Sequence, residues 1–114
     1  MLFKKKTLDE KMEKHVKHHD WYAIQEEITG SKEGKIAAAK ALGASDDQSS
    51  IDLLLRFIDD ADDDVVFAAC ESLRKVGSEH DTADLLARMQ KIPEDRQAIR
   101  DEIGKTVQEL HHRP

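Results

Sequence analysis

Apolar residues along this chain recur every three or four positions, the spacing that gathers them on one face of an α-helix. Trp21, Ile24 and Ile28 follow this spacing, whereas the alternation of β-branched and aromatic residues that marks a strand is missing. Glycines and prolines are few and fall between the apolar blocks. The pattern predicts seven helices, at residues 7–18, 20–29, 32–43, 48–60, 63–76, 79–91 and 94–112.

Residue types at the ends of the apolar blocks support these boundaries. Thr7 with Glu10 fits a capping box at a helix start, and so does Ser45 with Gln48. Pro93, followed by two acidic residues, predicts the first turn of the last helix. Three blocks are each followed by a glycine, at Gly30, Gly43 and Gly77. A left-handed glycine is favoured just after a helix, so these positions predict helix ends.

The helices fall into units of about thirty residues, the period of a repeat protein. The first helices repeat at Trp21, Ile24 and Ile28, then at Ile51, Leu54 and Ile58, then at Thr82, Leu85 and Met89. The second helices repeat at Ala38, Ala41 and Leu42, then at Ala69, Ser72 and Leu73, then at Ile103, Thr106 and Val107. We therefore expect one domain with three repeats at about 20–43, 47–76 and 79–112, preceded by a basic segment and capping helix at 1–19.

Two segments resemble a known repeat family. Residues 38–43 read Ala-Ala-Lys-Ala-Leu-Gly, and residues 62–77 begin with three aspartates and end on Leu-Arg-Lys-Val-Gly. Over residues 20–110 the chain resembles HEAT-like repeats of the phycobilisome-lyase type, in which an acidic turn precedes a Val-Arg pair, small residues and Ala-Leu-Gly. Ile99-Arg100 is similar to that pair, whereas the middle unit has Val65-Val66.

The resemblance implies an all-α fold, a short α-solenoid of about three HEAT-like helix pairs plus an N-terminal capping helix. It also implies that the second helices line a concave side. Such a resemblance identifies architecture and not activity.

The two ends of the array differ from its middle. In a stacked array an inner repeat is covered on both sides, whereas the end repeats need a polar outer face. The middle unit is apolar over a wide arc, while the last helix carries an apolar stripe at Ile99, Ile103, Val107 and Leu110 amid charged residues. Both ends thus resemble caps, and we expect a complete small solenoid that is monomeric.

Composition excludes several classes of protein. The chain has 114 residues, of which 39% are hydrophobic and 37% charged, and it contains one cysteine. A single cysteine excludes an internal disulfide framework and favours a reducing compartment, so we expect a cytoplasmic protein. No window approaches the roughly 18 apolar residues of a membrane helix, so no membrane partner is expected.

The net charge of −6 is unevenly distributed. Residues 1–19 contain six lysines and three carboxylates, a net +3, which leaves −9 on residues 20–114. An acidic body repels phosphate backbones, so nucleic-acid binding is disfavoured except through the basic start at Lys4-Lys5-Lys6.

Three histidines form a candidate metal site on the first predicted helix. His15, His18 and His19 are spaced i, i+3, i+4 and stand beside Asp20. Histidines four residues apart on a helix can bind one metal ion. However, a His-Glu-x-x-His arrangement is missing, and the other histidines are scattered. We interpret the three as a polar face near a helix C-terminus and expect no metal.

The acidic run at 59–64 suggests a calcium loop. Counting from Asp60, carboxylates fall at positions 1, 3 and 5, and Glu71 falls at position 12. Position six is Val65, where such a loop needs glycine, and the following residues already predict a helix. Carboxylates also stabilise a helix N-terminus, so the run needs no metal.

Neither the cysteine nor the large aromatic residues point to catalysis. Cys70 lies in the apolar arc of the middle unit, so we expect it to be buried and unreactive. Trp21 occupies the core position of Ile51, whereas Tyr22 is expected to be exposed. Because no catalytic triad or phosphate loop is present either, we expect no enzyme activity and no cofactor.

The leading hypothesis is therefore a non-enzymatic protein–protein interaction module or scaffold that uses the repeat surface. The candidate contacts lie on the second helices outside the core stripe, at Lys35, Lys40, Phe67, Glu71, Arg74, Arg100 and Lys105. Two alternatives remain open: an accessory subunit of a lyase-like cofactor-attachment system, suggested by the family resemblance, and nucleic-acid binding through the basic N-terminus.

Overall fold

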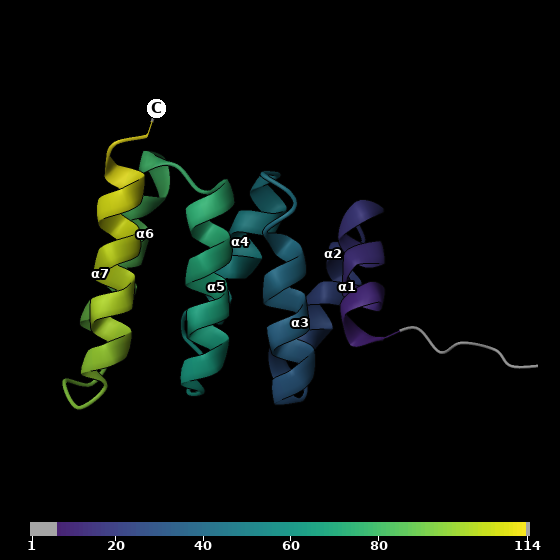
Figure 1. The fold of residues 1–114 in the computed structure, drawn as a ribbon, viewed down its shortest axis with the longest axis horizontal. Helices are drawn as coiled ribbons and strands as arrows, with labels where there is room; N and C mark the ends of the chain where they lie inside the picture. Colours follow the sequence, from purple (N-terminus) through teal and green to yellow (C-terminus); the bar gives the residue numbers. More distant parts are fainter. Residues whose placement is uncertain (1–6, 114) are drawn as a thin grey trace, which may run out of the picture.

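The computed structural model describes residues 7–113, in which every regular element is a helix (Figure 1). The α-helices are α1 (Leu8–Lys17), α2 (Trp21–Glu26), α3 (Lys32–Leu42), α4 (Gln48–Phe57), α5 (Asp63–Val76), α6 (Thr82–Gln90) and α7 (Gln97–His111). The short 3-10 helices η1 (Glu27–Thr29) and η2 (Glu79–Asp81) lie within the predicted segments 20–29 and 79–91. The basic run at Lys4-Lys5-Lys6, on which the nucleic-acid alternative depends, lies outside the described residues.

The helices form two layers, which confirms the predicted all-α solenoid. Helices α1, α3, α5 and α7 stand side by side in one layer, and α2, α4 and α6 lie behind them (Figure 1). Each helix of the front layer packs against the next one, α1 on α3, α3 on α5 and α5 on α7. The expected capping helix α1 therefore continues the layer of second helices.

One apolar core runs between the layers through all three repeats. Its largest fully buried side chains include Phe57, Leu54 and Leu73 of the middle repeat. Small residues let neighbouring helices approach closely: the Ser72 hydroxyl donates to the Ala39 carbonyl across 2.6 Å. A Cβ atom on Gly43 would lie 2.7 Å from the Ser72 oxygen, so only glycine fits at this contact.

The predicted helix starts at residues 32, 48 and 63 are confirmed, whereas the capping box predicted at Ser45 and the start of the last helix are wrong. The capping box of Thr7 and Glu10 is present at the start of α1. At α4, however, Asp47 caps the helix by accepting from the Ser49 N–H, and Ser45 accepts from the Asp47 N–H instead. The last helix begins at Gln97, because residues 93–96 form a turn.

Gly30, Gly43 and Gly77 do follow helix ends, as predicted, but the left-handed conformation expected of them is wrong. No glycine in residues 7–113 has a positive φ, and His19, with φ of 55°, takes that conformation. The His19 N–H bonds to the Val16 carbonyl and the Asp20 N–H to the His15 carbonyl, which together form a Schellman motif. This motif turns the chain sharply from α1 into α2.

Candidate functional site

A groove opens where α3 ends early. In the repeat register, residues 43–45 correspond to residues 74–76, which form the last turn of α5. Helix α3 stops at Leu42, so its last turn is replaced by the connection to α4. The missing turn leaves a gap in the front layer between α1 and α5.

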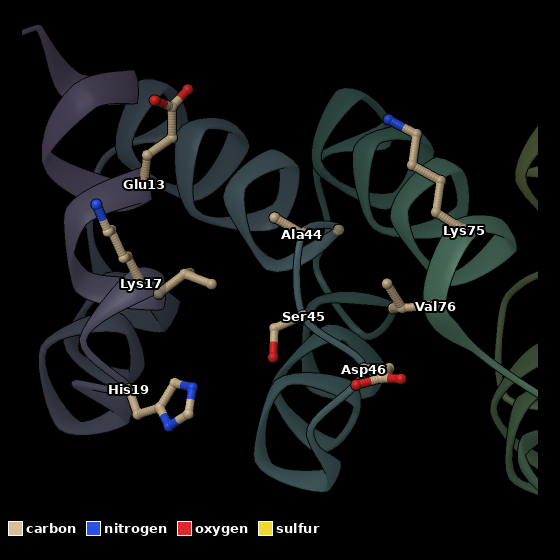
Figure 2. Close-up of a pocket in the computed structure, with 10 residues that line it drawn as sticks. Glu13, Lys17, His19, Ala44, Ser45, Asp46, Lys75 and Val76 are labelled. Carbon is tan, nitrogen blue, oxygen red and sulfur yellow. The ribbon is translucent and has the colours of Figure 1, made fainter.

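The groove has a volume of about 680 Å³ and is open to solvent. Figure 2 shows Ala44 and Ser45 between a wall that carries Lys17 and His19 and an opposite wall that carries Lys75 and Val76. The complete lining is Glu13, Val16, Lys17, His19, Gly43, Ala44, Ser45, Asp46, Lys75 and Val76. Because residues 43–45 have small side chains, no side chain fills the groove from its floor.

A smaller hollow extends the groove along α1 and α3. Its volume is about 220 Å³, and it shares Glu13 and Ala44 with the groove. Asp9, Lys40 and the alanines of α3 complete its lining. The two hollows adjoin at Glu13 and Ala44, and together they are called the track below.

Unpaired charges of both signs line this track. Lys17 and Lys75 are exposed on opposite walls, and neither forms an ion pair within residues 7–113. Glu13 and Asp46 are exposed acids of the same lining. An arrangement of this kind can bind a charged chain by ion pairs and hydrogen bonds.

Three predicted contact residues are held inside the fold. The Lys35 ammonium lies 2.7 Å from an Asp60 carboxylate oxygen, and the Arg100 guanidinium donates to the Ile92 carbonyl. Arg74 donates to Glu102 across 2.7 Å and to the Thr106 hydroxyl across 2.9 Å. All three side chains are half-buried. The expectation of free surface contacts therefore fails for them, because they join neighbouring segments of the array.

The other four predicted contacts are exposed, but they do not converge. Lys40 lies on the track, at its smaller hollow. Phe67, which is 38% exposed, and Glu71 lie on α5, and Lys105 lies on α7. Sequence reasoning missed Lys17 and Lys75, and the signal available for them was the three-residue difference in length between α3 and α5.

The acidic run joins the three repeats and does not form a calcium loop. Its carboxylates pair with cations from both neighbouring repeats, as Asp59 with Arg88, Asp60 with Lys35, Asp62 and Asp64 with Lys32, and Asp63 with Arg96. Helix α5 begins at Asp63, so Val65 is helical and no loop forms there. Partial desolvation opposes ionisation of Asp62, but the Asp64 N–H and Lys32 outweigh it and lower its pKa.

The three N-terminal histidines do not converge on a metal position. His15 faces Asp20 at 3.7 Å, whereas His19 stacks on the Trp21 ring with centroids 5.3 Å apart. Within residues 7–113, no three histidine, cysteine or acidic side chains are grouped as metal ligands. Trp21 packs against the core as predicted, and Tyr22 is 75% exposed, also as predicted.

Cys70 is completely buried between α5 and α7. Burial raises the pKa of its thiol to about 11, and contact with the Thr106 hydroxyl opposes this shift only in part. The thiol is therefore protonated and inaccessible at neutral pH, which argues against a role in cofactor attachment.

Native Cys70 is expected to resist thiol reagents. At neutral pH, labelling by a disulfide reagent should be slower than that of an exposed cysteine by about two orders of magnitude or more, because thiolate and access are both lacking. The rate should equal that of an exposed cysteine once the chain is unfolded in urea. An Asp52→Cys, Cys70→Ala variant, with its thiol on the exposed face of α4, supplies the reference rate. Fast labelling of the folded wild type would contradict the buried position.

Comparison with known proteins identifies a repeat family. A family model described as HEAT repeats matches residues 23–104, which is most of the chain. No curated protein and no solved structure matches. The finer resemblance to the phycobilisome-lyase type has no support from these comparisons. Among the described helices, none has the length and apolar character needed to cross a membrane.

Proposed function

The chain belongs to the HEAT-repeat family, and from this membership and the groove we propose that it is a non-enzymatic interaction module that binds an extended segment of a partner protein. HEAT repeats are generally protein-interaction scaffolds. The observation that carries the proposal is the missing last turn of α3, which opens a track across the front layer.

The lining of the groove favours a protein segment over a small molecule. Small-molecule sites are mostly apolar and enclose their ligand, whereas this groove is open and has charged walls. Lys17 and Lys75 can each receive an acidic side chain, and Val76 offers a half-buried apolar contact beside them. We therefore expect the bound segment to carry acidic residues that flank a small apolar one.

The groove also offers little for catalysis. His19 is the only lining residue whose usual pKa is near neutrality, and its ring stacks on Trp21. The lining contains no cysteine, and no lining hydroxyl hydrogen-bonds to a histidine. These features support a binding role for the site.

Comparative capture from native extract tests the proposal. Ala44→Trp should fill the groove, and the Lys17→Glu, Lys75→Glu double variant should repel an acidic segment. Gln25→Trp, which places the same indole side chain at an exposed site on α2, serves as the control. Quantitative mass spectrometry should find proteins bound by wild type and control and reduced about tenfold or more with both groove variants, a loss of about 1.4 kcal/mol. Equal capture by all four chains, or capture of nothing by wild type, would refute the proposal.

A further inference from the structure

The C-terminal end of the array exposes a surface that is buried in the middle repeat. Leu55, Ile58, Cys70 and Leu73 are each at most 4% exposed, and α6 and α7 pack beyond them. In the repeat register their counterparts in the last repeat are Leu86, Met89, Gly104 and Val107. Leu86 is 40% exposed, and Met89 and Val107 are only half-buried. A Cβ atom on Gly104 would have no neighbour within 4 Å.

The N-terminal end is built differently. Each inner helix of the front layer turns small residues toward the preceding helix, Ala37 and Ala41 on α3 and Ala68 and Ser72 on α5. When the buried Met12 and Val16 of α1 are aligned with Ala38 and Leu42 of α3, Lys11 and His15 correspond to the small residues Ala37 and Ala41. A long cation and an imidazole prevent close packing there, so this end cannot accept the C-terminal end of another copy.

The C-terminal end carries a protruding side chain on α6 and a hollow on α7, each at the middle of its helix. Leu86 is the central residue of α6, and Gly104 is the central residue of α7. Around Gly104 lies an open hollow of about 440 Å³, lined by Met89, Gln97, Arg100, Asp101, Gly104, Lys105 and Gln108. A two-fold axis parallel to the helices would place α6 of each copy against α7 of the other. Each Leu86 would then enter the partner's hollow, an isologous contact that closes on itself.

We propose that two copies of this chain associate in solution through their C-terminal ends, with Leu86 of each seated over Gly104 of the other. The end measures about 33 by 19 Å, which limits the contact to about 600 Å² per copy, at the lower limit for specific interfaces. We therefore expect a weak dimer that forms only at high protein concentration. The expected monomer assumed polar caps at both ends, and only α1 provides one.

Sedimentation equilibrium over a wide concentration range tests the dimer. Wild type should show a monomer–dimer equilibrium without larger species. Leu86→Glu and Gly104→Lys should each raise the dissociation constant by about tenfold or more. Gly104→Lys should at the same time raise the melting temperature measured on dilute protein, because lysine favours a helix more than glycine does and meets no neighbour. Loss of association without loss of folding separates an interface effect from damage to the fold.

Two matched controls locate the contact. Phe67→Glu, on the exposed face of α5, and Leu8→Glu, at the other end of the array, change apolar side chains that are 38% and 43% exposed. Both variants should dimerise like wild type. Loss of association in Leu8→Glu would show head-to-tail stacking and overturn the two-fold arrangement. A wild type that stays monomeric at millimolar concentration, or unchanged association of Leu86→Glu and Gly104→Lys, would overturn the proposal.

Discussion

Replacing Phe57 by alanine is expected to destabilise the protein by about 3–5 kcal/mol, the usual cost of removing a large aromatic side chain from a well-packed core. Phe57 is the last residue of α4 and is 1% exposed in the core of the middle repeat. The cavity would open in the repeat on which the first and third repeats both pack. Urea denaturation followed by circular dichroism measures the loss of unfolding free energy.

Phe67→Ala is the matched control for this prediction. The same side chain is removed, but Phe67 is 38% exposed on the outer face of α5. Its removal should cost no more than about 1 kcal/mol, because part of its surface is already hydrated and no closed cavity forms. Equal losses for the two variants would contradict the described core, in which Phe57 is fully buried and Phe67 is partly exposed.

Removing the Asp60 carboxylate is expected to cost about 2–3 kcal/mol, in the upper part of the range for hydrogen bonds to charged groups. One Asp60 oxygen accepts from the Asp62 N–H across 2.8 Å, and the other lies 2.7 Å from the Lys35 ammonium. The side chains of Asp60 and Lys35 are only 10% and 21% exposed, so water replaces these contacts poorly. Asp60→Ala also leaves Lys35 half-buried without its partner, which adds to the loss.

A double-mutant cycle separates these contributions. Lys35→Met combined with Asp60→Ala should lose less stability than the sum of the single variants, because the second change removes no further pair. Asp46→Ala, at an exposed aspartate without an ion pair in residues 7–113, should change stability by less than about 0.5 kcal/mol. Additive single effects, or an equal loss in Asp46→Ala, would show that the Asp60 pair does not join the first and middle repeats.

Local pattern was enough to predict the helices, because the residues that define a helical face lie within a few turns of one another. The apolar stripe of α4 recurs about thirty residues away in α2 and in α6, and this repetition can be read from the sequence. The burial of Cys70 and the packing of Trp21 against the core followed from their positions in the repeats. The capping residues were harder to predict than the helices, because one hydrogen bond decides between Ser45 and Asp47 as the cap of α4.

The residues of the candidate site could not be predicted in this way, because they depend on contacts between residues that are far apart in the sequence. Arg74 and Lys35 resemble surface cations in the sequence, and their partners lie 28 and 25 residues away along the chain. Those partners lie within ion-pair distance only after the neighbouring repeats have stacked on each other. The groove likewise exists because α1 and α5 stand on either side of the shortened α3.

The sequence by itself determined that the chain folds as helix pairs in three repeats with the widest apolar surface in the middle, since helical periodicity and repeat length are local properties. Tertiary structure alone decided which charges are paired inside the array, which are exposed along the groove, and that Leu86 and Gly104 remain uncovered at one end. The physical reason is that exposure and ion pairing depend on the neighbouring repeat, and the last repeat of the described chain has a neighbour on one side only.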